Sequence, residues 1–421
     1  MKFASQTKLL RDCVSAEKSL SDMLKSRRLD YESLVYADET NAQVLSGLPD
    51  FRPVDKRLKV AKGIPCVSFF SGAGGLDIGF ESAGFKTVAN VEIVKMFCDT
   101  LRKNGHKTIV GPPNAAGDMS DPKTVIRQLE AIGVPRNFPG VFHGGPPCQS
   151  FSIAANQRFN KTGENFKRTG FNHSKLGNLL FCYIEVICHF KPEVFLIENV
   201  DGLLTIDGGV QSARACSILR EAGYDVTEPR VVNAADYGVP QKRMRTIIVG
   251  SRIGHFDYPA TCPRQLPVGC VLKKSVVGLP NHQTREHSAE SVQRYMKLDF
   301  GKRDKLGRVD RLDPFKPSKT IIAGGTGGGG RSHLHPFVPR TMSVRECARI
   351  QTFPDSYEFT GPVARQFTQC GNAVPPVLAY EMACAIFRSI YAKRKERVSG
   401  GKPFRLDLSK LPKMGAADVL K

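Results

Sequence analysis

The stretch Val67-Ser-Phe-Phe-Ser-Gly-Ala-Gly-Gly75 joins an apolar run to the start of a helical pattern. A strand that ends in glycines and leads into a helix lets the backbone approach a nucleotide-like ligand closely. Glu92 follows the next apolar run, and an acidic side chain about 20 residues after such a turn binds ribose hydroxyls. A glycine turn by itself is as often structural, but together with Glu92 it favours a site for a nucleoside cofactor.

Strand-like runs alternate with helical segments from Cys66 to Gly250. The expected strands are Cys66–Phe70, Thr87–Val91, Gly140–His143, Val194–Ile197, Val226–Val232 and Thr246–Val249. The expected helices are Leu76–Ala83, Ile93–Lys103, Pro122–Ala131, Gly177–His189 and Val210–Ala222. This order predicts an α/β fold, with a doubly wound and mostly parallel sheet that has helices on both faces.

The pattern changes on both sides of this region, which indicates five segments. Residues 1–62 predict a helical extension, residues 63–250 a catalytic and cofactor-binding domain, and residues 251–342 a smaller irregular domain. Helical patterning returns in residues 343–392, through Val344–Thr352 and Ala373–Ala392, and residues 393–421 form a basic tail. We expect residues 343–392 to return to the catalytic domain.

The charge of the chain points to a polyanionic partner. The formal net charge is +21, which favours nucleic acid as the first candidate and an anionic membrane surface as the second. No stretch reaches the roughly 20 apolar residues that span a bilayer. The twelve cysteines form no CxxC pairs, which indicates reduced thiols in a cytoplasmic protein rather than a disulfide framework or a zinc site.

Cys148 stands in the stretch Gly144-Gly-Pro-Pro-Cys-Gln-Ser-Phe-Ser152, behind two prolines. Proline fixes φ and removes a backbone donor, so this segment is a stiff turn that holds one side chain in one direction. A cysteine is most often a small buried apolar residue, but the polar neighbours of Cys148 favour an attacking thiolate. Glu198 ends another apolar run, and we expect it to act as an acid rather than as a structural carboxylate.

Three polar side chains precede the last strand-like run, in Gln241-Lys-Arg-Met-Arg245. Alternate residues of a strand share a face, so Gln241, Arg243 and Arg245 are expected to point the same way, toward an anionic or carbonyl-bearing ligand. A solvated basic edge is the alternative. Asp118 is a candidate for contact with an exocyclic amine of the cofactor, although a helix N-cap fits nearly as well.

Two further stretches look like phosphate contacts. Residues 155–175 hold five basic residues against one acidic residue, and residues 264–311 hold eleven against five. The first stretch follows Cys148, as a mobile active-site loop would, although either stretch is alternatively a solvated face. His333 and His335 resemble a metal pair, but no acidic or cysteine cluster completes it, so we expect no metal.

An ordered series of motifs resembles the cytosine-C5 DNA methyltransferases of bacterial restriction-modification systems. The motifs run from about Cys66 to Arg388: Phe70-Ser-Gly-Ala-Gly-Gly75, Glu92, Asp118, Pro146-Pro-Cys-Gln149, Glu198-Asn-Val200, Gln241-x-Arg-x-Arg245, Arg345-Glu-Cys-Ala-Arg-Ile-Gln-Thr-Phe-Pro354 and Gly371-Asn-Ala-Val-Pro375. The resemblance implies methyl transfer from S-adenosylmethionine to C5 of a flipped-out cytosine in a short sequence of double-stranded DNA. It also implies a covalent adduct of Cys148 with C6 of that base.

The same resemblance implies roles for individual residues. The catalytic residues are Cys148, Glu198, Arg243 and Arg245. The residues that bind S-adenosylmethionine are Phe70, Gly72, Ala73, Gly74, Gly75, Leu76, Glu92, Ile93, Asp118, Met119, Pro146, Leu179, Asn372 and Val374. The residues that contact DNA are Gln149, Ser150, Arg158, Lys161, Gln241, Thr320 and Ile321. Residues 251–342 fall where the family has its target recognition domain. We expect a monomer on DNA that pairs functionally with a restriction endonuclease, although the sequence does not say whether this endonuclease exists.

Two departures from the family pattern concern the cofactor pocket. Ser68 replaces an aspartate that is common in the first strand, and Lys175-Leu176 stands where an arginine usually precedes Gly-x-Leu. Residues 1–62 lie outside the motifs. Two other functions stay open: a relative that methylates transfer RNA, and a non-catalytic paralogue that binds nucleic acid. The presence of Cys148, Glu198 and Arg245 together argues against the second.

Overall fold

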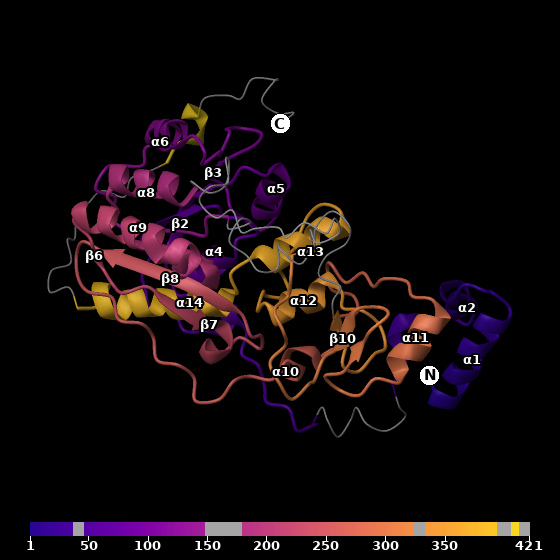
Figure 1. Cartoon of the computed structure of the whole chain (residues 1–421). Coiled ribbons are helices and arrows are strands. Elements are labelled where there is room, and N and C mark those ends of the chain that lie inside the picture. Colours follow the sequence, from indigo (N-terminus) through magenta and orange to yellow (C-terminus); the bar gives the residue numbers. More distant parts are fainter. Residues whose placement is uncertain (37–45, 148–178, 324–332, 394–405, 412–421) are drawn as a thin grey trace. The chain divides into compact units, whose positions relative to one another are not determined.

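The computed structural model describes residues 1–36, 46–147, 179–323, 333–393 and 406–411. The chain divides into two compact units. The sheet unit comprises Val54–Tyr237, Met244–Thr261 and Ala373–Lys421, and the N-terminal unit comprises Met1–Pro53, Gly238–Arg243 and Cys262–Asn372. The chain enters each unit more than once, so segments that are distant in sequence share one core (Figure 1).

The sheet unit is built on a sheet that has eight strands within the described residues. The strands are β1 (Pro65–Phe69), β2 (Lys86–Val91), β3 (Ile109–Val110), β4 (Val141–Gly144), β5 (Val194–Val200), β6 (Asp225–Val226), β7 (Arg230–Asn233) and β8 (Met244–Ser251). Their order is β3-β2-β1-β4-β5-β8-β6, and β7 also pairs with β8. Strands β1 to β5 are parallel, whereas β8 runs antiparallel to β5, β6 and β7.

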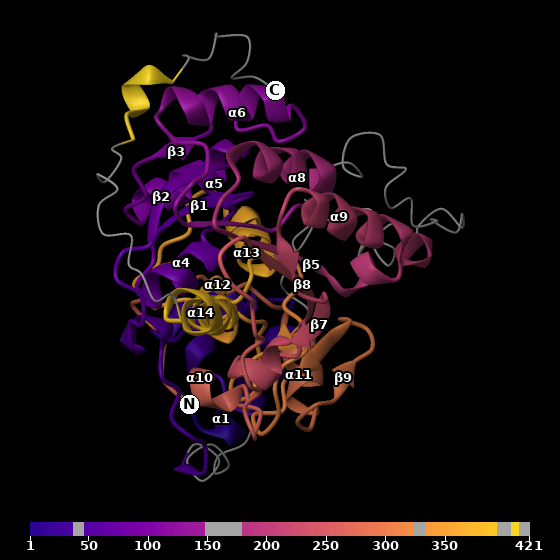
Figure 2. The same cartoon turned by 90° about the vertical axis from the view of Figure 1, so that its left-hand side faces the viewer.

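Helices cover both faces of this sheet. The helices of the unit are α4 (Gly75–Ser82), α5 (Lys95–Lys103), α6 (Pro122–Ala131), α8 (Leu179–Phe190), α9 (Val210–Glu221) and α14 (Pro376–Ile386). Figure 2 shows α4 and α14 on one side of the strands and α6 and α8 on the other. The core beneath α6, α8 and α9 contains the buried rings of Phe69, Phe142 and Phe195. The doubly wound α/β fold predicted from the sequence is confirmed.

Two elements of the sheet differ from the prediction. The sequence predicts one strand over Val226–Val232, but the structure divides this run into β6 and β7. Pro229 lies between them, and proline has no N–H to donate to a strand ladder. Strand β3 is not predicted, because its two residues are too few to show an alternating pattern.

The N-terminal unit combines short helices with a small sheet. Its helices are α1 (Phe3–Ser15), α2 (Leu20–Ser26), α10 (Gly269–Leu272), α11 (Ala289–Met296), α12 (Val344–Ile350) and α13 (Val363–Asn372). Its sheet has the order β11 (His333–Leu334), β10 (Val309–Arg311), β9 (Arg303–Asp304). The sequence predicts helices in the region of α1, α2 and α12 but not α13. Leu9 and Leu24 share a buried cluster with Val292 of α11, so the first helices belong to the core of this unit.

Because three histidines are buried, we expect acid to destabilise the protein. Burial lowers the pKa of His143, His333 and His335 to about 4 from the ordinary value of 6.5. Between these two pH values the unfolded chain binds more protons than the folded protein. The free energy of unfolding therefore falls as the pH falls, by about 1.4 kcal/mol per pH unit for each histidine. Urea unfolding near neutral pH and near pH 5 measures the difference.

The variant His143→Phe isolates one of these contributions. The ring of His143 stacks on Phe80 with centroids 4.4 Å apart, and phenylalanine keeps an aromatic ring at this place but takes up no proton. We expect this variant to lose less stability than the wild type on acidification. An unchanged pH dependence would show that His143 does not titrate in the unfolding reaction.

Candidate active site

The glycine-rich turn after β1 has the backbone that a close ligand approach requires. Phe70, Gly72 and Gly74 have φ values of 51°, 56° and 69°, in the left-handed region. Glycine adopts this region at no steric cost, whereas Phe70 is held there with its ring edge-on to the ring of Tyr183 in α8, at 5.9 Å between centroids. The turn leads into the N-terminus of α4, where backbone N–H groups suit an anionic or nucleotide-like ligand.

Glu92 ties this turn to the end of β2. Its carboxylate accepts hydrogen bonds from the backbone N–H groups of Gly72 (2.7 Å) and Val94 (2.8 Å). The pKa of Glu92 lies above its ordinary value, because burial raises it by more than these hydrogen bonds lower it. The acidic side chain that the sequence predicts for ribose binding therefore lies directly beside the glycine turn.

The segment before α14 lies against the start of α4. A Cβ atom on Gly75 would lie 2.2 Å from the backbone oxygen of Val374, so only glycine fits at this position. Val374 is buried, whereas Asn372 is the exposed last residue of α13 and belongs to the N-terminal unit. Of these two predicted cofactor residues, the structure thus brings Val374 to the glycine turn.

Asp118 lies in the loop that follows β3. A Cβ atom on the preceding Gly117 would lie 2.3 Å from the backbone oxygen of Glu92, so this loop runs against the end of β2. Oδ1 of Asp118 accepts a hydrogen bond from N of Ser120 (2.9 Å). The N-cap of α6 is Asp121, so the alternative role of Asp118 as a helix cap is wrong.

Glu198 and Arg245 form an ion pair on neighbouring strands. Nε of Arg245 lies 2.8 Å from Oε1 of Glu198, and the two side chains are 14% and 11% exposed. In the antiparallel pairing of β5 with β8, Val200 lies opposite Arg245, so Glu198 and Arg245 are diagonal neighbours on one face of the sheet. The pair holds the carboxyl group of Glu198 in one place while leaving part of it accessible.

The residues that precede Cys148 in the sequence lie beside Glu198. A Cβ atom on Gly145 would lie 2.8 Å from Oε2 of Glu198, so a larger residue at this position would displace the carboxyl group of Glu198. Nδ2 of Asn199 donates a hydrogen bond to the backbone oxygen of Pro146 (3.2 Å). Gly145 and Asn199 are not among the site residues predicted from the sequence. Two features of the sequence could have identified them: the glycine pair before two prolines, and the amide next to the predicted acid.

Arg243 has a different environment from the one predicted. Strand β8 begins at Met244, and Gln241 and Arg243 belong to the N-terminal unit. Arg243 is 1% exposed, and its guanidinium donates hydrogen bonds to the backbone oxygens of Ile321 (3.3 Å) and Gly371 (2.9 Å). The expected shared face of Gln241, Arg243 and Arg245 is therefore wrong, because the strand alternation does not extend to the first two. Arg243 therefore joins the backbone of residue 321 to that of residue 371.

Gln241 is also bound within the N-terminal unit. Its Oε1 accepts a hydrogen bond from N of Ile321 (2.9 Å), and its Nε2 donates to Oε1 of Gln351 (2.9 Å). Oγ1 of Thr320 donates to the backbone oxygen of Lys242 (2.8 Å). Gln241 and Ile321 have no exposed surface, so this conformation excludes the direct DNA contacts predicted for them.

The other predicted residues fall into three groups. Ala73, Leu76, Met119, Pro146 and Leu179 are buried. Ile93 is exposed. Cys148, Gln149, Ser150, Arg158 and Lys161 lie outside the described residues.

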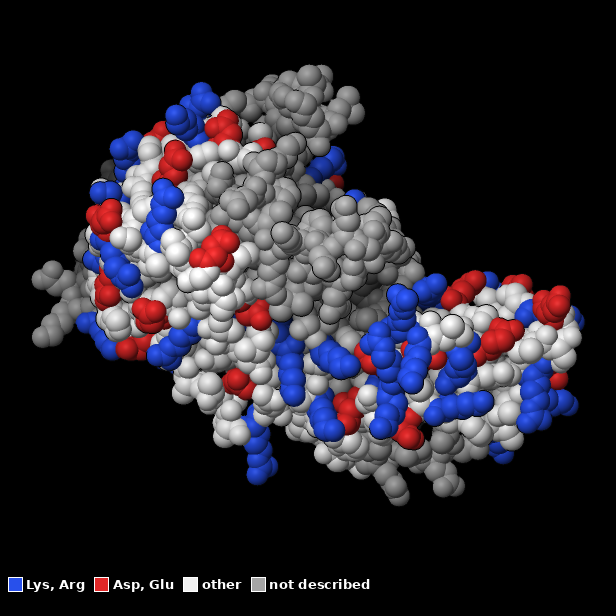
Figure 3. Space-filling model, viewed as in Figure 1, with Lys and Arg blue, Asp and Glu red and all other residues white. Residues whose placement is uncertain are grey.

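Basic side chains gather on the N-terminal unit. Figure 3 shows many Lys and Arg side chains over the region of α10, α11 and β10, with fewer Asp and Glu among them. The exposed basic residues between positions 264 and 319 are Arg264, Lys274, Arg285, Lys297, Lys302, Arg303, Lys305, Arg308, Lys316 and Lys319. A surface of this charge attracts a polyanion.

Metal binding and membrane insertion find little support in the described part of the chain. No group of three His, Cys, Asp or Glu side chains there is arranged to hold a metal ion. The segment Val363–Tyr391, which includes α13 and α14, is long and apolar enough to cross a membrane, but 78% of its apolar window is buried inside the protein. Core helices of soluble proteins have the same property.

Comparison with known proteins decides the family. The family model for the C-5 cytosine-specific DNA methylases matches residues 64–388. The chain belongs to this family. Type II methyltransferase M.Eco47II from Escherichia coli is 32% identical over 349 residues, which cover 76% of this chain and 78% of that protein. Type II methyltransferase M.PspPI from Psychrobacter sp. (strain TA137) is 33% identical over 359 residues, covering 78% and 80%.

A solved structure shares the fold of the methylase. A putative DNA modification methyltransferase encoded within a prophage (E. coli) superposes with a TM-score of 0.62, covering 78% of this chain and 99% of that one at 23% sequence identity. The family predicted from the motifs is confirmed. The enzyme class of the methylase is therefore DNA (cytosine-5-)-methyltransferase.

Proposed function

We propose that this methylase transfers a methyl group from S-adenosylmethionine to C5 of a cytosine within a short specific sequence of double-stranded DNA. The observation that carries the proposal is the ion pair between Glu198 and Arg245 (2.8 Å), next to Gly145 and Pro146. Cytosine C5 is a poor nucleophile, so the ring must first be activated by a nucleophile and an acid. The carboxyl group of Glu198 lies beside the segment that leads to Cys148, which supports Glu198 as the acid and Cys148 as the nucleophile.

The glycine turn fits the proposed cofactor. Gly72 and Gly74 adopt the left-handed backbone that brings N–H groups close to a ligand, and buried Glu92 adjoins them. We therefore assign the nucleoside part of S-adenosylmethionine to this turn, with Asp118 and Val374 at its borders. When bound, S-adenosylmethionine supplies a methyl group that its sulfonium makes electrophilic.

The chain's own residues activate the target base in two steps. The thiolate of Cys148 adds to C6, and the carboxyl group of Glu198 donates a proton at N3, which makes C5 enamine-like. Arg245 holds Glu198 through Nε. After C5 has gained the methyl group, a base removes the C5 proton and the C6–sulfur bond breaks, which returns the thiolate of Cys148. N3 then gives its proton back to the carboxylate of Glu198, which restores the acid.

The target cytosine has to leave the duplex before this chemistry. Its C5–C6 edge is unreachable inside the base stack, and extruding the base costs a few kcal/mol. We assign duplex binding to the N-terminal unit, which includes most of the target recognition domain proposed for residues 251–342. Its exposed basic side chains bind phosphates and make the affinity depend on salt. Arg243 acts as a positioning residue in this unit rather than as the catalytic residue predicted from the sequence.

We place the methylase in the cytoplasm, as a monomer on DNA that protects its sites from a partner restriction endonuclease. The relatives from Escherichia coli and Psychrobacter are named type II methyltransferases, which supports this setting.

Transfer of labelled methyl groups from S-adenosylmethionine to mixed genomic DNA, followed by bisulfite sequencing, tests the proposal. We expect label at cytosine C5 within one short motif. Label in transfer RNA instead of DNA would favour an RNA methylase. Binding of DNA without any transfer would favour a non-catalytic paralogue.

The variant Gly75→Ala should weaken cofactor binding. Its Cβ atom would lie 2.2 Å from the oxygen of Val374, so the start of α4 and this segment must separate. Overpacking of this kind costs about 1–3 kcal/mol, and we expect the Kd for S-adenosylmethionine to rise about tenfold. Calorimetric titration measures the Kd.

Gly254→Ala is the matched control, because its added Cβ would make only an ordinary contact of 3.6 Å with Ile390. It should bind the cofactor as the wild type does. If Gly75→Ala bound S-adenosylmethionine as tightly as the wild type, the contact between Gly75 and Val374 would not be part of the cofactor site.

A further inference from the structure

Residues 281–287, here named the anchored segment, are fixed at their first residue. Nδ2 of Asn281 donates to the backbone oxygen of Phe359 (2.8 Å), and Oδ1 of Asn281 accepts from N of Phe359 (2.9 Å). N of Arg345 donates to the backbone oxygen of Asn281 (3.1 Å). Asn281 has a φ of 63°, a left-handed conformation that asparagine tolerates better than most residues. The start of the segment thus has a defined conformation.

The other end of the anchored segment is held by the N-terminal helices. The hydroxyl of Tyr31, at the start of a short 3-10 helix (Tyr31–Ser33), accepts a hydrogen bond from N of His287 and donates one to the backbone oxygen of His287, both at 2.9 Å. Nε2 of His287 accepts from N of Thr341 (3.2 Å). A single hydroxyl therefore satisfies both backbone groups of His287, which is buried.

The next residue, Glu32, reaches the beginning of the same segment. Its Oε1 lies 3.3 Å from Nε2 of His282 and 2.7 Å from Nε of Arg340, which is 1% exposed. Arg340 is also paired with buried Glu346 (2.6 Å). Burial raises the pKa of Glu32, but hydrogen bonds from His282 and Arg340 lower it, so the pKa lies below its ordinary value. Two consecutive residues that lie outside the family match at 64–388 thus bind both ends of the anchored segment.

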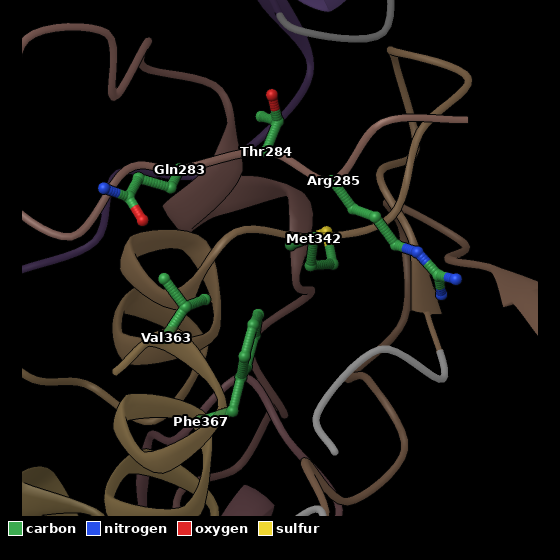
Figure 4. Close-up of a pocket in the computed structure, with 6 residues that line it drawn as sticks. All are labelled: Gln283, Thr284, Arg285, Met342, Val363 and Phe367. Atoms are coloured by element: carbon green, nitrogen blue, oxygen red, sulfur yellow. The ribbon is translucent and has the colours of Figure 1, made fainter. Parts of the chain in front are cut away.

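Between its two ends the segment presents polar side chains above an apolar floor. The side chains of Gln283 and Arg285 are exposed, and Figure 4 shows them pointing in opposite directions from the backbone, with Thr284 on a third side. Together with Met342, Val363 and Phe367 they line an open pocket of about 160 Å³. An amide, a hydroxyl and a guanidinium are the groups that bind phosphates and base edges of DNA.

The acidic residue of the segment is turned to the N-terminal helices. Oε1 of Glu286 accepts a hydrogen bond from Oγ of Ser21 (2.8 Å) and lies 3.9 Å from Nζ of Lys25. The nearby cation of Lys25 reduces the repulsion between this carboxylate and a polyanion. The N-terminal helices therefore affect both the conformation and the charge of the anchored segment.

We propose that Gln283, Thr284 and Arg285 contact the DNA, and that residues 1–36 act as a positioning element for this contact. The proposal rests on the proposed function, because DNA is the ligand. It gives a role to the part of the chain that precedes the family match. It also makes the N-terminal helices necessary for DNA affinity but not for cofactor binding or for the chemical step.

The variant Arg285→Ala tests the contact. We expect the KM for DNA to rise by about five- to a hundredfold, with kcat and the Kd for S-adenosylmethionine unchanged. Relaxed sequence preference would identify a base contact, and a smaller salt dependence at unchanged preference would identify a phosphate contact. Arg11→Ala, which removes the same charge from an exposed position of α1, is the control and should match the wild type. A wild-type KM in Arg285→Ala would overturn the proposal.

The variant Tyr31→Phe tests the positioning role, because it removes only the hydroxyl that binds His287. We expect the KM for DNA to rise about five- to tenfold without a change in kcat, and Glu32→Gln to act in the same direction. In combination with Arg285→Ala the effect of Tyr31→Phe should shrink, since both act through one segment. Glu17→Gln, at an exposed position of the same extension, should change nothing.

Two results separate failure of this proposal from failure of the proposed function. A wild-type protein that transfers no methyl group to DNA would refute the proposed function itself. An active wild type whose Tyr31→Phe variant keeps the wild-type KM, or loses kcat and cofactor affinity as much as DNA affinity, would refute the positioning role alone.

Discussion

The variant Cys148→Ser should lose methyl transfer, by at least about 10⁴-fold, while it still binds S-adenosylmethionine and DNA. Serine has nearly the size of cysteine, but a hydroxyl is not ionised near neutral pH and is a poor nucleophile without an adjacent base. Without the addition at C6, C5 stays unreactive. Single-turnover transfer of labelled methyl to DNA that carries the motif measures the loss.

A covalent trap makes this test sharper. DNA with 5-fluorocytosine at the target position should leave the wild type attached to DNA in a denaturing gel, because fluorine cannot depart as the C5 proton does. Cys148→Ser should form no such complex. The control is Cys262→Ser, which changes an exposed cysteine of the N-terminal unit and should behave as the wild type. Turnover by Cys148→Ser would remove Cys148 from the mechanism.

The variant Glu198→Gln should slow the chemical step by about 10²–10⁴-fold, which is the usual contribution of a general acid. Glutamine has the shape of glutamate and can still accept a hydrogen bond from Arg245, but it has no acidic proton to donate at N3. The loss should therefore appear in kcat, with little change in the Kd for DNA or cofactor. Rapid-quench measurement of a single turnover isolates this step.

Two further variants show whether the ion pair matters. Glu185→Gln makes the same change at an exposed position of α8 and should leave the rate unchanged. Arg245→Gln should slow the chemical step, and its effect should not add fully to that of Glu198→Gln, because the two side chains are in contact (2.8 Å). An unchanged rate in Glu198→Gln would mean that another group protonates N3.

Local patterns of the sequence were enough to predict the architecture of the sheet unit. The segment Pro122–Ala131 coincides with α6, because a proline at the first turn and helical spacing of apolar residues act within a few residues. The glycine turn at Gly72 and Gly74 was predictable for the same reason, since left-handed backbone selects glycine. The prediction of a single strand over Val226–Val232 was wrong because Pro229 interrupts the hydrogen-bond ladder. The apolar pattern alone does not show this interruption.

The different environments of Arg243 and Arg245 were not predictable from the sequence. Arg243 and Arg245 stand two positions apart in one motif, yet the first is bound to backbone oxygens of residues 321 and 371 and the second to Glu198. The reason is that β8 begins between them, at Met244. A pattern with a period of two residues does not reveal where a strand begins.

The sequence by itself determined the family, the alternation of strands and helices in the sheet unit and the candidate chemistry of Cys148 and Glu198, because motifs and periodicity are properties of neighbouring residues. Only the tertiary structure decided which distant groups meet. It brought Gly145 against Glu198, Val374 against Gly75, and Tyr31 and Glu32 against residues 281–287. These contacts join residues far apart in the chain, and buried polar groups are held by whichever partners the packing of the core supplies.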